Sequence, residues 1–361
     1  MAVTSYGVNS PEAVKLWSRK LFHEALKQTY ASKFMGKDSN SLCQVQTDTS
    51  KGPGDRVRMI LRMLLTGDGI QGDGTLEGNE EALTTYTDNV FIDQLRHAVR
   101  SGGKMSEQRI PYSVREEARS GLQDWWADRI DTWFFNTLAG SLLQSDTRYT
   151  GNQAATEPTA LHHFVANGTG VSLQSAVTET TTGSASASNT FKLIHIDSLI
   201  RTAKLSNPQI RPVKVGGDDM YVMFLHPRQI KDMRIDATAA RVTWYDAQKS
   251  AMTGGRVENN PIFTGAQGVY NNTIIHESTR VPHGGSSATL TNTHRAIFCG
   301  AQAASMAFGQ GFGSSRMSWM EELFDYGNQL GVSAGMIAGM KKTVFNSADF
   351  GVLTLTTGYV D

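Results

Sequence analysis

The chain has 361 residues, of which 39% are hydrophobic, so it is long and apolar enough to bury a sizeable core and is not a disordered protein. Its 34 lysines and arginines are balanced by 34 aspartates and glutamates, so it lacks the excess positive charge of a dedicated nucleic-acid binder. Cys43 and Cys299 are expected to be buried free thiols of a protein made in a reducing cytoplasm, and neither a signal peptide nor a run of roughly 18 apolar residues is present.

The first part of the chain predicts an arm and a hairpin. A Ser-Pro-Glu sequence at residues 10–12 is typical of a helix start, and apolar residues then recur at helical spacing to about Phe34. From Arg56 to Leu65 apolar and polar residues alternate, which predicts a half-buried strand whose second face carries Arg56, Arg58 and Arg62. A second alternating run at residues 90–100 follows a long acidic loop, so the two strands are expected to form an extended hairpin.

The strongest helical pattern follows Pro111. Ser113 and Glu116 have the spacing of a capping box, and apolar residues recur every four positions to about Gln144. This predicts a helix of about 32 residues, roughly 48 Å long, that serves as a spine for other elements. The tryptophans on it are expected to pack in the core and not to form an aromatic cage; they are Trp125, Trp126 and Trp133.

The second half predicts a mixed α+β domain after a polar segment. Residues 145–189 are rich in Thr, Ser, Ala and Gly, and we interpret them as an insertion or long surface loop that carries His162 and His163 as a surface pair. A helix is then expected at residues 191–205. Strands are expected at residues 220–225, 273–276, 295–299 and 351–357.

The glycine-rich loop contains Gly67-x-Gly69-x-x-Gly72, the spacing of a dinucleotide-binding turn. No helix start follows the third glycine, and the carboxylates of the loop would repel a phosphate. A Walker sequence fails because Asp73 stands where a lysine is needed. A calcium loop that starts at Asp73 lacks its last carboxylate, since Thr84 occupies that position. A fortuitous cation remains an alternative to a solvated or partner-facing loop.

Other motifs give no enzyme chemistry. Residues 331–335 match the G-x-S-x-G nucleophile sequence, but the last histidine, His294, precedes them, so a tight small-residue turn is the better interpretation. The carboxylate pairs Glu116-Glu117 and Glu321-Glu322 are expected on solvated helix faces. We therefore predict no catalytic, cofactor-binding or metal-ligating residue. The alternative is a nucleotide-dependent oxidoreductase that uses the loop from Gly67 to Gly72.

Several long stretches resemble one protein family in the same order along the chain. They are the loop GDGIQGDGTLEGNEE at residues 67–81, MYVMFLHP at 220–227, NPIFTGAQGVY at 260–270, and the C-terminal segment at 324–355. These stretches resemble the major capsid proteins of tailed bacteriophages, specifically the N-four-like family. The resemblance spans nearly the whole chain outside residues 145–189.

The resemblance implies an α+β fold of the Hong Kong ninety-seven capsid type. It divides the chain into an N-terminal arm at residues 1–53, an E-loop hairpin at 54–106, a peripheral domain at 107–145 and 314–361, an insertion at 146–190, and an axial domain at 191–313. The implied function is a coat protein of the virion that forms hexamers and pentamers of an icosahedral head around double-stranded DNA after assembly in the bacterial host cytoplasm.

The implied partners are copies of the same chain, a separate scaffolding protein, a portal and optionally a decoration protein, with no membrane and with DNA contacted only weakly and nonspecifically. No cofactor is implied. The E-loop tip is expected to contact a neighbouring subunit through Asp68, Asp73, Glu77, Glu80 and Glu81. The candidate basic surface that receives it carries Arg56, Arg58 and Arg62.

Overall fold

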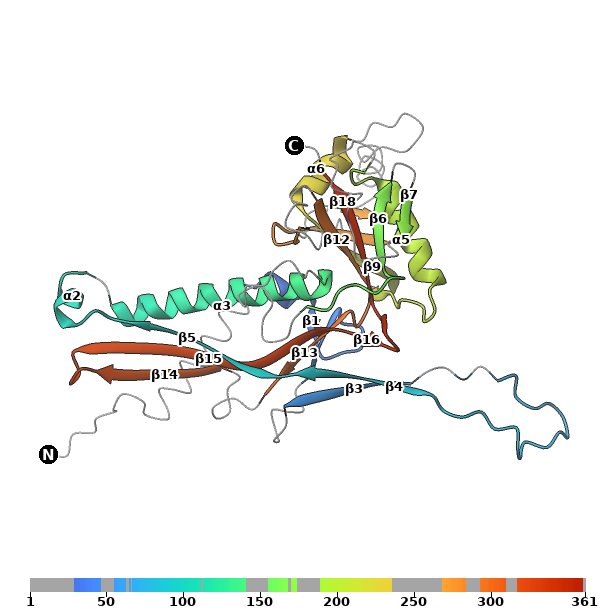
Figure 1. Cartoon of the computed structure of the whole chain (residues 1–361), viewed down its shortest axis with the longest axis horizontal. Helices are drawn as coiled ribbons and strands as arrows, with labels where there is room; N and C mark the ends of the chain where they lie inside the picture. The colour runs from blue at the N-terminus through green and yellow to red at the C-terminus, as the bar shows by residue number, and fades with distance from the viewer. Residues whose placement is uncertain are drawn as a thin grey trace.

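The computed structural model describes residues 29–46, 55–62, 65, 67–111, 113–140, 155–167, 170–173, 189–235, 268–283, 293–309 and 317–359. In Figure 1 a long helix lies along an elongated sheet, a second domain stands at one end of it, and a loop projects beyond that end. The predicted arm helix lies mostly outside the described residues. Its last part, Tyr30–Phe34, is the short 3-10 helix η1.

The structure has two main sheets and two small ones. The six-stranded sheet contains β1 (Met35–Gly36), β2 (Cys43–Gln46), β13 (Ala304–Phe308), β15 (Gln329–Lys342), β14 (Met317–Phe324) and β5 (Asp93–Arg100). The eight-stranded sheet contains β10 (Gly268–Tyr270), β11 (Thr273–Glu277), β9 (Asp218–Leu225), β12 (Thr293–Cys299), β18 (Val352–Gly358), β6 (His163–Asn167), β7 (Gly170–Leu173) and β8 (Val213–Val215). The small sheets pair β3 (Arg56–Arg62) with β4 (Thr85–Phe91), and β16 (Val344–Phe345) with β17 (Ala348–Asp349).

The helices of the described residues are α2 (Lys104–Gln108), α3 (Val114–Ala139), α5 (Leu193–Leu205) and α6 (Pro227–Ile235). Of these, α3, α5 and α6 contribute to the two larger hydrophobic cores, whereas α2 has no buried residue. The first core joins α3 to the six-stranded sheet and includes Trp126 and Trp133, so the predicted core role of these two tryptophans is confirmed. The second core joins α5 and α6 to the eight-stranded sheet. The helix at 191–205 and all four later strands are present where the sequence predicts them.

The long helix α3 is shorter than predicted. It has 26 residues, about 39 Å, and ends at Gly140, which adopts a left-handed conformation with φ 62°. Arg295 then satisfies the free carbonyl groups at this end by donating to the oxygens of Ala139 (3.1 Å) and Gly140 (2.8 Å). The predicted capping box is absent, because the side chain of the N-cap residue Ser113 makes no capping hydrogen bond.

The hairpin differs from the prediction in its return strand. β3 pairs antiparallel with β4, whereas β5 pairs with β15 in the six-stranded sheet. The chain changes sheets at Ile92, next to Gly339 of β15, where any Cβ would collide with the carbonyl oxygen of Phe91. Alternation at residues 90–100 was therefore correct as a strand signal but wrong about the partner.

Two predictions that placed polar residues on the surface are wrong. Residues 163–167 and 170–173 of the predicted insertion form β6 and β7 of the eight-stranded sheet, and His162 and His163 are only 6% and 5% exposed, so they are not a surface pair. Glu321 lies on strand β14 and not on a helix. It is buried and bonded to Arg115 Nε (2.7 Å) and Trp319 Nε1 (2.8 Å).

Three further predictions are settled by the fold. The G-x-S-x-G match lies inside strand β15 and not in a turn. Glu116 and Glu117 are exposed on α3, as predicted. Cys43 and Cys299 are buried free thiols, also as predicted. Among the described residues, no helix is long and apolar enough to cross a membrane.

Candidate functional site

The acidic loop, residues 67–84, connects β3 to β4 and projects from the body (Figure 1). It contains no lysine or arginine. Its glycines Gly69, Gly72 and Gly78 have φ values of 68°, 64° and 89°, and open space surrounds each of them. Backbone conformation, and not crowding, therefore explains these three glycines, as expected for a loop that must turn sharply.

Two of the predicted loop carboxylates shape the loop itself. Glu81 Oε2 accepts a hydrogen bond from the Gly67 amide (2.7 Å), and Glu80 Oε2 accepts one from the Gly78 amide (2.8 Å). The other three predicted carboxylates, Asp68, Asp73 and Glu77, are exposed. A partner could therefore bind these three without breaking the bonds that hold the loop in shape.

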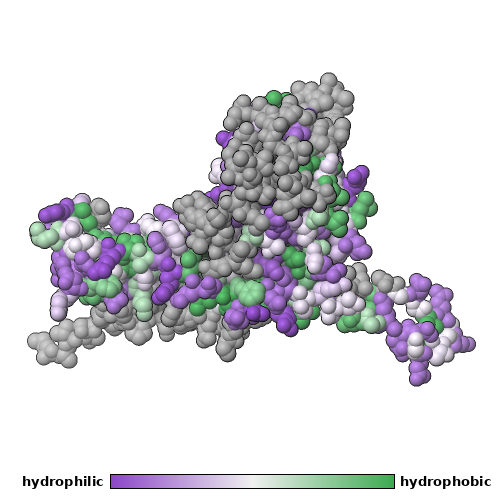
Figure 2. All heavy atoms as spheres, in the orientation of Figure 1, coloured by the Kyte–Doolittle hydropathy of each residue, from purple (hydrophilic) through white to green (hydrophobic). Residues whose placement is uncertain are grey.

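The loop also exposes apolar side chains. Figure 2 shows a mostly hydrophilic projection with a few hydrophobic side chains within it. Leu76 is 62% exposed and Leu83 is 58% exposed, and Leu65, which precedes the loop, is 62% exposed. Burial of such side chains against a partner would add hydrophobic stabilisation to the electrostatic contact.

The loop does not have the geometry of a nucleotide site. The residues after Gly72 form a turn and irregular chain up to β4, so no helix N-terminus can meet a pyrophosphate. Within the part of the chain that the structure describes, no three His, Cys, Asp or Glu side chains gather as metal ligands would.

The predicted basic residues are exposed on one face of β3, while Val57 is buried on the other. Arg56 lies over the ring of Phe91, with 4.6 Å from its guanidinium carbon to the ring centroid. Arg58 lines a cavity of about 350 Å³, and Arg62 lines a larger one. The structure therefore confirms that the three arginines share a face, but Arg58 and Arg62 line different hollows and Arg56 lines neither of them.

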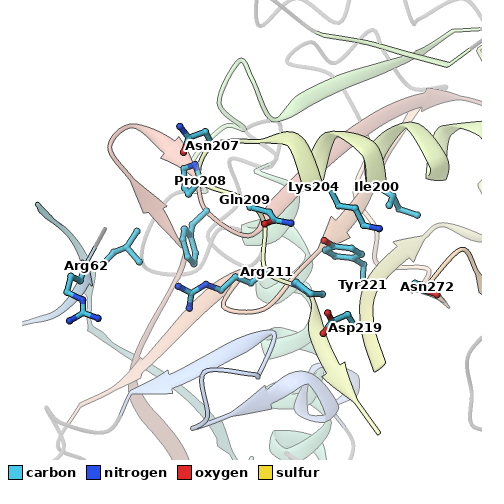
Figure 3. Close-up of a pocket in the computed structure, with 13 residues that line it drawn as sticks. Arg62, Ile200, Lys204, Asn207, Pro208, Gln209, Arg211, Asp219, Tyr221 and Asn272 are labelled. Atoms are coloured by element: carbon cyan, nitrogen blue, oxygen red, sulfur yellow. The ribbon is translucent and has the colours of Figure 1, made fainter. Parts of the chain in front are cut away.

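The larger hollow, which we call the basic groove, has a volume of about 680 Å³ and lies between β3 and the end of α5 (Figure 3). Its basic side chains are Arg62, Lys204 and Arg211, and Asp219 is its single carboxylate. The rest of the lining is formed by the amide side chains of Asn207, Gln209 and Asn272 and by Leu61, Ile200, Pro208, Pro212, Tyr221 and Phe350. Sequence reasoning missed Lys204 and Arg211, because only the fold brings them beside β3.

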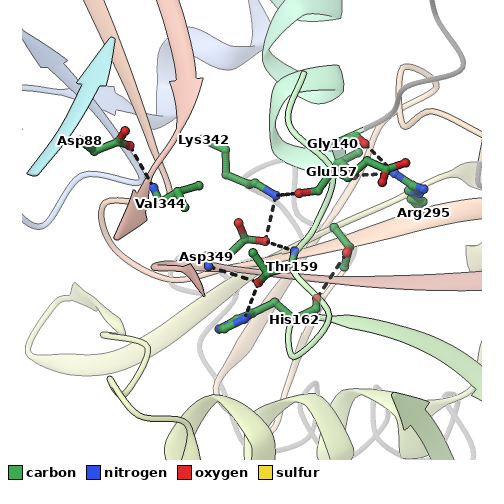
Figure 4. Close-up of polar contacts among 11 residues, drawn as sticks. Asp88, Gly140, Glu157, Thr159, His162, Arg295, Lys342, Val344 and Asp349 are labelled. Carbon is green, nitrogen blue, oxygen red and sulfur yellow. Dashed lines mark hydrogen bonds and ion pairs between the residues drawn. The ribbon is translucent and has the colours of Figure 1, made fainter. Parts of the chain in front are cut away.

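Polar contacts connect β4, which follows the acidic loop, to the end of β15 and to the small sheet of β16 and β17. At the end of β15, Lys341 forms an ion pair with Asp88 of β4, and Lys342 Nζ lies 2.8 Å from Asp349 Oδ2. The Asp88 carboxylate also accepts the Val344 amide (3.1 Å; Figure 4). The Lys342 and Asp349 side chains are 0% and 1% exposed. Burial lowers the pKa of Lys342, and the nearby carboxylate of Asp349 opposes that shift.

The chain was compared with known proteins. The profile of a family described as phage capsid protein matches residues 5–359. The major capsid protein of Pseudomonas phage KPP25 is 30% identical over 382 aligned residues, which cover 98% of this chain and 96% of that protein.

Solved structures are similar over the same extent. The capsid of Ralstonia phage GP4 has a TM-score of 0.75 and 34% identity and covers 100% of this chain and 99% of its own. The capsid of cyanophage Pam1 has a TM-score of 0.71 at 20% identity and covers 92% and 93%, which supports the fold alone.

Proposed function

The chain belongs to the phage capsid protein family and is a major capsid protein of the virion, not an enzyme, and from this premise we propose that its copies assemble through the acidic loop into hexamers and pentamers. Its α+β fold is of the Hong Kong ninety-seven type. Family membership excludes the oxidoreductase alternative. The proposed head is icosahedral and encloses double-stranded DNA.

The observation that carries the proposal is a charge match between two separate surfaces. The acidic loop has exposed carboxylates and no basic residue, and the basic groove has three basic side chains against one carboxylate. Within the described residues, no ion pair joins Asp68, Asp73 or Glu77 to the groove. A second copy of the chain is therefore the partner that suits each surface.

The geometry of such a contact favours rings. The loop and the groove are different surfaces of one chain, so a contact between them is head-to-tail. Repeated head-to-tail contacts close into rings when the rotation per copy permits it and otherwise continue as open assemblies. Hexamers and pentamers are two closed rings of this kind, in which each copy gives one loop and receives another.

The apolar parts of both surfaces support the same pairing. Leu76 is adjacent to Glu77 in the loop, and Leu83 follows shortly after Glu81. The groove likewise combines cations with apolar side chains such as Tyr221 and Phe350. Docking would bury leucine and carboxylate together, so it would combine hydrophobic burial with charge-assisted hydrogen bonds.

The proposal also includes the subfamily of the chain, its division into domains and its further partners. The stretches at residues 67–81 and 324–355 support membership of the N-four-like subfamily. We keep the division into arm, E-loop, peripheral domain, insertion and axial domain with one change: β18 is grouped with the axial domain because it pairs with β12. A separate scaffolding protein, a portal and optionally a decoration protein are the further partners. DNA contact is weak, nonspecific and lost with added salt.

Charge reversal in the loop tests the proposal. The variant Asp73→Lys/Glu77→Lys places like charge against the groove, so we expect shell yield to fall at least about ten-fold, as measured by sedimentation and electron microscopy. The matched control Glu116→Lys/Glu117→Lys makes the same charge change on the exposed face of α3 and should assemble normally.

A compensating change identifies the receiving surface. Lys204→Glu/Arg211→Glu alone should also impair assembly, and its combination with the loop reversal should recover part of the yield, because opposite charges again face each other. Unchanged shell yield in the loop variant would contradict the proposal. Recovery by Arg56→Glu/Arg58→Glu in place of the groove variant would move the contact to the exposed face of β3.

A further inference from the structure

Three histidine rings form a stack at one end of the central strands β12 and β18 of the eight-stranded sheet. The ring of His294 on β12 lies 3.7 Å from that of His226, centroid to centroid, with 10° between the planes. The ring of His283 lies 4.5 Å from that of His294, centroid to centroid, with 26° between the planes. Tyr359, just after β18, stacks on His294 at 5.1 Å, and Arg228 of α6 lies over the tyrosine ring at 4.3 Å. The stack therefore joins four segments that are distant in the sequence.

The hydrogen bonds around the stack suit neutral rings. His294 is 1% exposed, and neither of its ring nitrogens has a hydrogen-bond partner. His226 Nδ1 accepts the Arg228 amide (3.3 Å), so it must lack a proton. The side chain of Gln229, next to the stack, also bonds only to neutral groups. Its Oε1 accepts a hydrogen bond from the His226 amide, and its Nε2 donates to Thr357 Oγ1 (2.7 Å).

The charged groups around the stack oppose protonation. The groups that act against a positive charge on His294 are His226, His283 and Arg228, and only the carbonyl oxygen of Pro282 favours it. Asp232, the carboxylate of α6, acts on neither His226 nor His294. Arg280, on the same segment as His283, turns away to Asp128 of α3. Among the described residues, no carboxylate is thus in place to compensate a cation in the stack.

We propose that the stack of His226, His283 and His294 is an acid-sensitive joint, which holds α6, residues 278–283, β12 and the end of β18 together while its rings are neutral. When one ring takes up a proton, it becomes a cation between stacked rings and beside Arg228, and His226 also loses its bond from the Arg228 amide. The segments then separate while α3 and the six-stranded sheet stay folded.

The direction of the pH effect follows from the burial of the rings. Burial is the largest cause that lowers the pKa of His294 to about 3 and that of His226 to about 4. A histidine in an opened segment titrates near its ordinary value of about 6.5. The joint is therefore strongest above about pH 6.5 and weakens as the pH falls from there through the folded values.

Hydrogen exchange of the assembled full-length protein, measured from neutral pH to about pH 4 and corrected for intrinsic exchange, tests the joint. Each proton taken up on opening raises the opening constant by up to about ten-fold per pH unit. We expect this rise in peptides from β12, α6 and the end of β18, and no such rise in peptides from α3.

Phenylalanine keeps a stacked ring but cannot take up a proton. The expected slope comes from His226 and His294, whose pKa values burial lowers. His226→Phe should therefore reduce the pH slope of the joint peptides from about two protons to about one, and His294→Phe should do the same if the buried site accepts it. The control His97→Phe removes a histidine stacked on Trp125 at 4.5 Å in the other sheet and should leave the slope unchanged. The proposal is overturned if the native joint shows no pH slope, if His226→Phe keeps the native slope, or if the control changes it equally.

Discussion

Replacing Lys342 by methionine tests how much the buried ion pair with Asp349 stabilises the fold. The exchange keeps a long side chain but leaves the Asp349 carboxylate, whose side chain is 1% exposed, without its cation. Only the Thr159 amide still donates to Oδ2 (3.2 Å), and Oδ1 has no partner. Breaking a buried ion pair in this way typically costs about 3 to 5 kcal/mol.

The cost has an upper limit that can be worked out. An isolated buried carboxylate can take up a proton, and at neutral pH that neutralisation costs about 4 kcal/mol. We therefore expect Lys342→Met to lower the free energy of unfolding by about 3 to 4 kcal/mol at neutral pH. The loss should shrink as the pH is lowered, because the proton then becomes easier to supply.

Urea unfolding of the purified chain, followed by tryptophan fluorescence, measures this loss. The matched control is Lys341→Met, because the Lys341 side chain is 19% exposed. In this variant the Asp88 carboxylate still accepts hydrogen bonds from the amides of Asn89 (2.8 Å) and Val344 (3.1 Å). We therefore expect it to lose less than about 2 kcal/mol of the free energy of unfolding. Replacing both members of the buried pair, as Lys342→Met/Asp349→Leu, should recover much of the loss. Equal losses in Lys342→Met and Lys341→Met would refute the reasoning.

Two further predictions concern packing and reactivity. Gly339→Ala places a Cβ against the carbonyl oxygen of Phe91, so it should lower the free energy of unfolding, measured in urea, by about 1 to 3 kcal/mol. The control Gly121→Ala, on the exposed face of α3, should leave that free energy unchanged or raise it by up to about 1 kcal/mol. The opposite order of the two variants would contradict the sheet change at Ile92. Burial raises the pKa of Cys43 to about 12 and raises that of Cys299 as well, so a thiol reagent at neutral pH should label neither residue before unfolding, and rapid labelling of the native chain would show that the core is open.

Periodicity predicted the elements whose signal is local. The alternation at residues 56–62 and the four-residue spacing in α3 each record one buried face, so both elements were predictable. Alternation does not identify a pairing partner, which is why β5 was assigned to the hairpin. The end of α3 at Gly140 was missed because apolar residues continue beyond it, although a glycine in the left-handed conformation is a common helix end.

The candidate site was predictable only in its acidic half. The loop is one continuous stretch with carboxylates and glycines, so its charge and shape can be inferred from the sequence. The groove assembles Arg62 from β3 with Lys204 from the last turn of α5 and Arg211 from the segment after it, and no local pattern links them. Glu321 was missed for the same reason, because its partner Arg115 comes from a distant helix.

A cryo-electron microscopy reconstruction of the assembled shell would test the central claim most directly. The density of the acidic loop can be followed from β3 and β4 of one copy to whichever surface its tip contacts. We predict that Asp73, Leu76 and Glu77 lie in the basic groove of a neighbouring copy, within ion-pair distance of Lys204 or Arg211. A tip that lies against another surface, with an open groove in every copy, would contradict the account.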